Sequence, residues 1–196
     1  DRRRTNPSHR RRNARGSPPA GAPLHLAWGG RRLTFIAPPS RFSSHRIDDG
    51  TRLLLDHLPP IEPRAFLDLG CGYGALGLPI AARWSGARGT LVDRDLLAVE
   101  AARGNAARER IANVEVLPSL GYSAAPPGPF DWILSNVPAR AGERVFAGFI
   151  AGGMARLAEG GEMRIVAIAP LADAVRRAGE AAGPEPPPVA ATGRPA

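Results

Sequence analysis

The sequence predicts an α/β fold in which a doubly wound, mostly parallel β-sheet is covered by helices on both faces. Two observations predict this class: short apolar runs alternate with longer helical patterns over residues 65–169, and the first of these runs ends in a cluster of glycines. A third observation adds an amino-terminal β-hairpin, because apolar residues alternate on both sides of Gly29-Gly30 within residues 24–36.

The first elements of the domain follow from capping residues, prolines and apolar runs. After the hairpin, residues 48–51 can cap a helix that carries four leucines and stops at Pro59-Pro60. Residues 65–69 are expected to form the first strand of the sheet, since they are a short apolar run followed by glycines. A helix is expected over residues 75–84, where Pro79 must lie in the first turn or kink the helix.

The later elements repeat the alternation of strand and helix. Further strands are expected at residues 90–92, 114–117, 130–134 and 163–169. An alanine-rich helix is expected over residues 96–110 and another from about residue 143, with Gly160-Gly161 ending the second. Residues 171–182 show a last helical pattern, and no antiparallel hairpin that would close the sheet is evident after it.

The net charge of +8 is concentrated at the amino terminus. Residues 1–20 hold seven of the 26 basic residues and one of the 18 acidic residues, a balance of +6, which leaves +2 for the rest of the chain. We expect residues 1–23 to be a disordered arginine-rich tail, which is either simply solvated or a sequence-independent contact to phosphates. Residues 24–182 then form the folded domain, and the proline-rich residues 183–196 a loose end.

The composition excludes several classes of mechanism and of protein. All basic residues except the histidines are arginine, so a Schiff-base lysine or a phosphate-loop lysine is excluded. Cys71 is the single cysteine, which excludes an internal disulfide and fits a reducing, cytoplasmic location. No apolar run approaches the length of a membrane-spanning helix, and the four scattered histidines predict no metal site.

The glycine cluster after the first strand predicts a nucleotide-binding loop and can be aligned in two ways. Gly72, Gly74 and Gly77 fit the dinucleotide pattern G-x-G-x-x-G. Gly70, Gly72 and Gly74, preceded by Asp68, fit instead the nucleoside-binding loop of class I methyltransferases. Asp68 favours the second alignment, because a carboxylate would repel a diphosphate but attract a cationic methionine group. The alternative role for this acid is helix capping.

Two further acidic residues follow the second strand. Asp93 ends that strand, where a carboxylate can accept both hydroxyls of a ribose. Both families of nucleotide-binding proteins use such an acid, so Asp93 indicates adenosine binding without choosing the cofactor. Asp95 is expected to cap the next helix, and Cys71 to be a small residue in a tight loop rather than a nucleophile.

The fourth strand is followed by Asn136, Val137 and Pro138. Ligands of open parallel sheets bind at the carboxyl ends of the strands, so residues 135–140 are expected to face the glycine cluster. The Asn136 amide oxygen and the carbonyl of Val137 or Pro138 are two acceptors that can hold the hydrogens of an amine and direct its lone pair. Asn136 can alternatively cap a turn, and Arg140 can contact a phosphate or be solvated.

Together these motifs resemble the small-domain class I S-adenosylmethionine methyltransferases of the ribosomal-RNA guanine-N2 type, over about residues 42–169. The resemblance implies a Rossmann-like methyltransferase fold, S-adenosyl-L-methionine as the cofactor and RNA as the partner. It is carried by Phe42-Ser43, residues 47–51, 67–78 and 92–95, Asn105 and residues 130–138.

The site residues that we expect fall into three groups. The cofactor group is Asp68, Gly70, Cys71, Gly72, Gly74, Asp93, Arg94, Ser119 and Leu120. The catalytic group is Asn136 and Pro138, and the substrate-binding group is Phe42, Val137 and Arg140.

The sequence also departs from the family pattern. The Asn-Pro-Pro-aromatic loop of the family stands here as Asn136-Val137-Pro138-Ala139, which lacks the aromatic that stacks on a base. Leu120 replaces an acid that often recognises the adenine amino group, so that contact falls to Ser119 or the backbone. Larger family members add an RNA-recognition domain, for which this chain leaves no room. Three alternatives to an RNA methyltransferase therefore stay open: a methyltransferase for a small molecule or protein side chain, a non-catalytic binding chain, and a nicotinamide oxidoreductase.

Overall fold

The computed structural model describes residues 23–38, 46–137, 143–168 and 189–192. Within these residues the chain forms a six-stranded sheet and a separate two-stranded hairpin. The sheet has the order β5-β4-β3-β6-β7-β8. Its strands are β3 (Ala65–Leu69), β4 (Arg88–Asp93), β5 (Val114–Pro118), β6 (Phe130–Asn136), β7 (Leu157–Ile168) and β8 (Val189–Thr192).

Every pair of neighbouring strands in this sheet runs parallel. The chain proceeds from β3 outward to β4 and β5, then returns to the other side of β3 with β6 and continues to β7 and β8. The carboxyl ends of β3 and β6 therefore flank the switch point of the topology, where open α/β sheets bind ligands.

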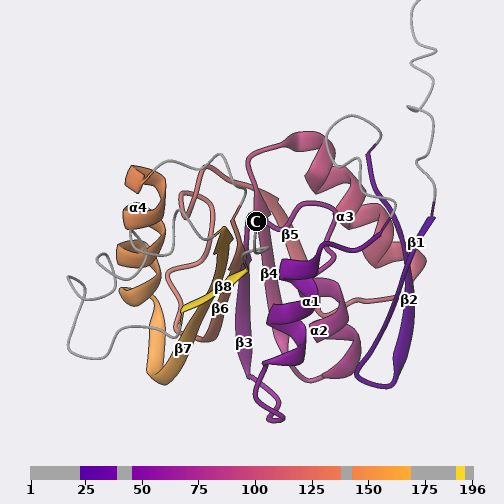
Figure 1. The fold of residues 1–196 in the computed structure, drawn as a ribbon, viewed down its shortest axis with the longest axis horizontal. Helices are drawn as coiled ribbons and strands as arrows, with labels where there is room; N and C mark the ends of the chain where they lie inside the picture. Colours follow the sequence, from indigo (N-terminus) through magenta and orange to yellow (C-terminus); the bar gives the residue numbers. More distant parts are fainter. Residues whose placement is uncertain (1–22, 39–45, 138–142, 169–188, 193–196) are drawn as a thin grey trace, which may run out of the picture.

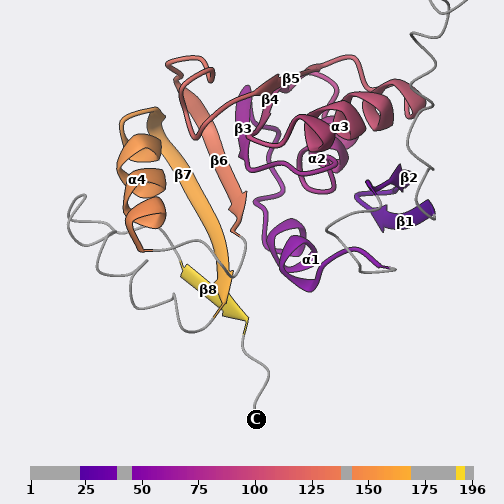
Figure 2. The same ribbon diagram turned by 90° about the horizontal axis from the view of Figure 1, so that it is seen from above.

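Helices cover both faces of the sheet, which confirms the predicted doubly wound architecture. The helices are α1 (Asp49–Asp56), α2 (Gly77–Arg83), α3 (Leu96–Arg108) and α4 (Glu143–Met154). Helices α1, α2 and α3 lie on one side of the sheet together with the hairpin, and α4 lies on the other side (Figures 1 and 2). None of the helices in the described part of the chain has the length and apolar character needed to cross a bilayer.

Two apolar clusters form the core, one on each face of the sheet. Phe66 packs in the cluster under α1, α2 and α3, whereas its neighbour Leu67 packs in the cluster under α4. This division follows from strand geometry, because successive side chains of a β-strand point to opposite faces. On the α4 side, Phe146 and Ile150 supply the apolar surface of the helix.

The predicted amino-terminal hairpin is present as β1 (Pro23–Trp28) and β2 (Arg31–Ile36), joined at Gly29-Gly30. Asn105 of α3 fixes the end of this hairpin to the domain. Its Oδ1 accepts from the Ile36 amide at 2.9 Å, and its Nδ2 donates to the Ile36 carbonyl at 3.1 Å and to the Tyr73 carbonyl at 2.9 Å. Since this amide group is only 1% exposed, these bonds satisfy a polar group that burial would otherwise destabilise.

The prediction that Gly160-Gly161 end the fourth helix is wrong. Helix α4 ends at Met154, and both glycines lie inside β7, where the pairing with β6 shifts register. Gly160 has a φ of +71°, and a Cβ on Gly161 would lie 2.8 Å from the Phe130 carbonyl oxygen. The two glycines therefore permit an irregularity within a strand, a role that local sequence does not distinguish from a helix stop.

The carboxyl-terminal end of the domain also differs from prediction. The expectation that residues 183–196 are a loose end is wrong for Val189–Thr192, which form β8 and pair with β7. The outer strand β8 runs parallel to β7. The helix expected over residues 171–182 and residues 1–22 of the expected tail lie outside the described residues. The expected tail ends one residue too late, because Pro23 begins β1.

Candidate functional site

The loop between β3 and α2 turns sharply at the carboxyl edge of the sheet. The amides of Gly70 and Cys71 both donate to the Val92 carbonyl, at 2.8 and 2.9 Å, which anchors the loop to the end of β4. Gly70 and Gly72 have φ values of +79° and +56°, and a Cβ built on either residue would meet no atom within 4 Å. Glycine is therefore favoured at both positions by backbone conformation, and the space beside them is open to a ligand.

Gly74 and Gly77 are required for packing, and Gly74 also for its φ of +90°. A Cβ on Gly74 would lie 2.6 Å from Leu78 Cδ1, and one on Gly77 would lie 2.8 Å from Leu91 Cγ. Gly77 thus lets α2 lie close to the sheet, whereas Gly74 lets the loop lie close to Leu78 of α2. The glycine cluster is thus divided into an open pair, Gly70 and Gly72, and a packing pair.

Asp68 lies beneath this loop, in the middle of the sheet. The residue is 1% exposed, and its Oδ2 accepts from the Gly77 amide at 2.8 Å. Helix α2 has no capping side chain of its own at Leu76, so Asp68 performs the capping role that the sequence offered as the alternative. The pKa of Asp68 is raised to about 7, chiefly by burial; the hydrogen bond from Gly77 opposes this rise, and the charge of Asp93 contributes to it. A cationic group bound over the loop would favour the ionised carboxylate.

Asp93 orders the same loop from the end of β4. Its Oδ2 accepts from the Gly72 amide at 2.8 Å, and its Oδ1 accepts from the Asp95 amide at 2.9 Å. Each oxygen keeps a second lone pair, so the half-buried carboxylate can still accept two hydroxyl donors. Asp95 caps α3 as predicted, with its Oδ1 accepting from the Leu97 amide at 3.0 Å.

Cys71 is buried, and its Sγ lies 3.6 Å from the Gly72 carbonyl oxygen, to which it donates. Burial raises the pKa of the thiol above its ordinary value, and the charges of Asp68 and Asp93 act in the same direction. The neutral thiol is consistent with a small residue in a tight loop and does not suit a nucleophile.

The segment after β5 contains the two residues expected near an adenine ring. The Ser119 hydroxyl donates to the Gly121 carbonyl at 2.8 Å and accepts from the Ala124 amide at 3.0 Å, so it is engaged within its own loop. Leu120 is 77% exposed. Leu96 and Leu97, in the first turn of α3, are also exposed large apolar residues.

Asn136 ends β6, and its side chain reaches the amino terminus of α1. Its Nδ2 donates to Asp48 Oδ1 at 2.8 Å and to Thr51 Oγ1 at 3.0 Å. Both bonds use the amide nitrogen, so the amide oxygen is not needed to hold the side chain. Sequence reasoning named residues 47–51 as a family mark but assigned Asp48 and Thr51 no part in the site.

One hydrogen bond joins the start of the Asn136 segment to the end of β3, directly before the glycine loop. The buried Ser135 hydroxyl donates to the Leu69 carbonyl at 2.7 Å, which joins the ends of β6 and β3. Burial raises the pKa of the Tyr73 phenol, in the glycine loop, to about 12. The nearby negative charge of Asp48 contributes to this rise, which places the start of α1 close to the loop.

The remaining predicted residues are placed as follows. Val137 is buried and its amide donates to the Val166 carbonyl at 2.9 Å, so only its own carbonyl is available to a substrate. Arg94 is exposed beside Asp93. Phe42, Pro138 and Arg140 lie outside the described residues.

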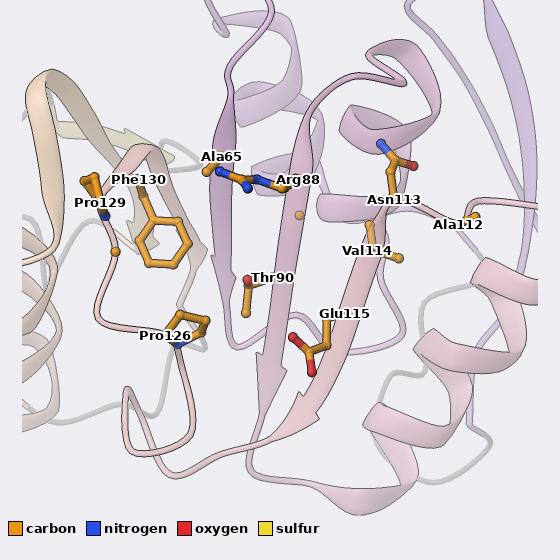
Figure 3. A pocket seen from close by; sticks show the side chains of 12 residues that line it. Ala65, Arg88, Thr90, Ala112, Asn113, Val114, Glu115, Pro126, Pro129 and Phe130 are labelled. Carbon is orange, nitrogen blue, oxygen red and sulfur yellow. The ribbon is translucent and has the colours of Figure 1, made fainter.

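A hollow of about 480 Å³ lies at the opposite edge of the sheet (Figure 3). Its lining comes from the amino-terminal ends of the strands, including Ala65, Arg88, Val114 and Phe130. Because ligands of parallel sheets bind at the carboxyl edge, this hollow is not the candidate site. Among the described residues, no three potential metal ligands come together anywhere in the fold.

Comparison with known proteins agrees with this geometry. The model of the methyltransferase small domain family matches residues 32–175. Ribosomal RNA small subunit methyltransferase C of Pseudomonas putida is 37% identical over 139 residues, covering 69% of this chain and 41% of that protein. The protein of the same name from Pseudomonas paraeruginosa is 36% identical over 148 residues, covering 74% and 43%. The chain therefore spans less than half the length of these curated relatives.

Two solved structures show the same fold. The T. thermophilus 16S rRNA N2 G1207 methyltransferase, in complex with AdoMet and guanosine, superposes with a TM-score of 0.64 and 31% identity, over 72% of this chain and 40% of that chain. The precorrin-6y C5,15-methyltransferase of Geobacter metallireducens superposes with a TM-score of 0.62 at 15% identity, over 76% of this chain and 77% of that one. The second likeness concerns the fold alone.

Proposed function

The chain belongs to the methyltransferase small domain family, and on this basis we propose that it binds S-adenosyl-L-methionine and methylates an exocyclic amino group of an RNA base. The proposed target is the N2 group of a guanine in small-subunit ribosomal RNA. The names of its relatives, and the AdoMet and guanosine in the T. thermophilus structure, support this choice. The observation that carries it is the juxtaposition of the open glycine loop with Asn136, whose amide oxygen is not used to hold the side chain.

The residues of the loop fit this cofactor. The open backbone at Gly70 and Gly72 can lie against the cofactor, and Asp93 can accept its two ribose hydroxyls. The ionised form of Asp68 suits a cationic methionine group nearby. Exposed Leu120 offers the adenine ring an apolar contact. When bound, S-adenosyl-L-methionine supplies a methyl group activated by a positively charged sulfonium.

Asn136 acts on the substrate amine in this proposal. The lone pair of an exocyclic amine is delocalised into the base, which makes the amine a poor nucleophile. By accepting its hydrogens, the Asn136 oxygen and the Val137 carbonyl direct the lone pair and stabilise the positive charge that develops on the nitrogen. Alignment of this kind lowers barriers by up to roughly 7–11 kcal/mol. Pro138 is proposed to stiffen the loop.

The experiment is transfer of labelled methyl groups to separated pools of 16S rRNA, protein and small molecules. We expect label in the 16S rRNA pool, at the N2 position of guanine. The variant Asn136→Ala should lower kcat by about 100-fold or more, the effect of removing one oriented polar group from an active site. Titration with S-adenosylhomocysteine should show that this variant binds the cofactor product as the wild type does.

Other outcomes identify which part of the proposal fails. Label in the protein or small-molecule pool instead of RNA would contradict the substrate class but leave the methyltransferase activity. Unchanged turnover of Asn136→Ala, with binding intact, would contradict the role of Asn136. Tight binding of NAD and none of S-adenosylhomocysteine would contradict the cofactor.

The arginine-rich tail is proposed to strengthen RNA binding through phosphate contacts, with Phe42 and Arg140 as further substrate-binding residues. Removal of residues 1–20 takes away seven arginines and should weaken RNA binding and flatten its dependence on salt. Cofactor binding should stay the same, since the cofactor residues lie in the domain. Equal RNA affinity and equal salt dependence of the two chains would contradict this role. An rRNA substrate also agrees with the cytoplasmic location expected from the single cysteine.

A further inference from the structure

The first turn of α1 holds the Asn136 amide group in one of its two possible orientations. Asp48 Oδ1 accepts from Asn136 Nδ2 at 2.8 Å, and Thr51 Oγ1 accepts from the same nitrogen at 3.0 Å. These contacts join parts of the chain that are 88 and 85 residues apart in sequence. The terminal torsion of asparagine is broad and roughly two-fold, so such partners decide which end of the amide points where.

Asp48 is the partner that discriminates between the two ends. An ionised carboxylate only accepts hydrogen bonds, whereas the Thr51 hydroxyl can either donate or accept. A flipped Asn136 would therefore bring its amide oxygen against the carboxylate oxygen of Asp48. Asp48 favours the orientation in which the nitrogen faces Asp48 and Thr51, while the oxygen Oδ1 lies beside Gly50 and makes no hydrogen bond within the described residues that would occupy it.

Asp48 is itself held in place by the helix. The same oxygen that accepts from Asn136 accepts from the Gly50 amide at 2.8 Å, which is the capping bond of α1. A Cβ on Gly50 would lie 2.8 Å from Val166 Cγ1 and 3.0 Å from Asn136 Oδ1. Glycine at this position thus lets α1 pack directly against the ends of β6 and β7. Thr51 is only 5% exposed, so its hydroxyl also has little freedom.

We propose that Asp48 and Thr51 are positioning residues for the methyl transfer: they hold the Asn136 nitrogen so that its oxygen faces the substrate amine. The inference rests on the proposed function, because it gives Asn136 Oδ1 a substrate to contact. Without the two acceptors, the amide rotates and presents N–H groups to an amine that needs an acceptor.

Two matched pairs of variants test this proposal. Asp48→Ala removes the acceptor, whereas Asp48→Asn keeps an oxygen that can both cap α1 and accept from Asn136. Thr51→Val removes the second acceptor at nearly constant shape, whereas Thr51→Ser keeps it. With 16S rRNA as the probe, Asp48→Ala should lower kcat by about 10- to 100-fold, in the range expected for a misplaced catalytic group. Asp48→Asn and Thr51→Ser should stay within about three-fold of wild type in kcat, as small changes that keep each acceptor.

A double-mutant cycle separates positioning from simple stabilisation of the helix. In the Asn136→Ala background, Asp48→Ala should have no further effect on kcat, because the amide that it positions is gone. An equal loss of kcat in both backgrounds would overturn the proposal, since it would show that Asp48 acts independently of Asn136. Full turnover of Asn136→Ala would overturn it as well, while leaving the methyltransferase activity itself established.

A spectroscopic measurement tests the orientation without any turnover. The side-chain amide resonances of Asn136 in 15N-labelled protein are assigned by their absence in Asn136→Ala. Asp48→Ala and Thr51→Val should move these resonances toward the positions of a free asparagine and speed their exchange with water, whereas Thr51→Ser should not. Unchanged resonances in both Asp48→Ala and Thr51→Val would overturn the proposal even if the substrate of the enzyme proved to be a different one.

Discussion

The buried carboxyl of Asp68 should make the stability of the protein depend on pH in a way that Asp68→Asn removes. Asp68 lies 1% exposed beneath the glycine loop, and burial raises its pKa from 3.8 to about 7. A carboxyl with a higher pKa in the folded state binds its proton more tightly there than in the unfolded state. Its stabilising contribution is therefore complete below pH 3.8 and is lost as the pH rises through 7.

The size of the effect follows from this shift. One pKa unit corresponds to about 1.36 kcal/mol, and the loss accumulates evenly between pH 3.8 and about pH 7. Between pH 5 and pH 8, the free energy of unfolding of the wild type should fall by about 2–3 kcal/mol more than that of Asp68→Asn. The asparagine oxygen can still accept from the Gly77 amide, so the variant retains the cap on α2. Burial opposes ionisation of Asp131, but Arg64 and its backbone lower the pKa of this carboxyl overall. Asp131 therefore affects stability at more acidic pH, outside the range from pH 5 to pH 8.

The assay is urea unfolding followed by circular dichroism at half-unit steps from pH 5 to pH 8, without cofactor. The difference between wild type and Asp68→Asn at each pH cancels the contributions of the other titratable groups. The same series with S-adenosylhomocysteine, whose ammonium group is cationic, should show a smaller difference at pH 8 because a bound cation favours the carboxylate. Parallel curves for the two proteins without ligand would refute the raised pKa and with it the cost of ionising Asp68.

Two further predictions concern the glycine loop and the hairpin. Gly72→Ala should lower the free energy of unfolding by only about 1–2 kcal/mol, the usual cost of a left-handed residue, but should weaken S-adenosylhomocysteine binding by at least about ten-fold as the new methyl group fills the open space. Gly74→Ala, in which the methyl group meets Leu78, should lower the free energy of unfolding more than Gly72→Ala does. Calorimetric titration measures the cofactor affinity of both variants, and urea unfolding measures their stability. Equal losses of affinity and equal losses of stability in the two variants would contradict this contrast. Asn105→Ala removes three hydrogen bonds, one to the buried Tyr73 carbonyl and two to the half-buried backbone of Ile36, so it should lower the free energy of unfolding by about 2–4 kcal/mol. Hydrogen exchange should show faster opening of β2 in this variant, and unchanged protection there would contradict the tethering role.

Much of the architecture could be predicted because it depends on local periodicity. Apolar alternation around Gly29-Gly30 fixed the hairpin, and the bounds of β3 agree with the apolar run at residues 65–69. The capping of α3 by Asp95 was predictable for a similar reason, since a cap depends on a side chain within a few residues of the helix start. One feature that depended on a distant partner strand was predicted wrongly. Gly160-Gly161 form an irregularity in β7 rather than a helix stop, because β6 pairs alongside them.

The candidate site shows the same division. The sequence by itself determined which residues stand at the carboxyl ends of the strands: Asp68 with the glycine loop, Asp93 and Asn136. Only the tertiary structure decided what each of them does. It buries Asp68 under Gly77, separates the open glycines from the packing ones, and turns the Asn136 amide toward Asp48. The physical reason is that burial, close approach and hydrogen bonds between side chains depend on distances between residues far apart in the chain, and a local sequence pattern does not contain those distances.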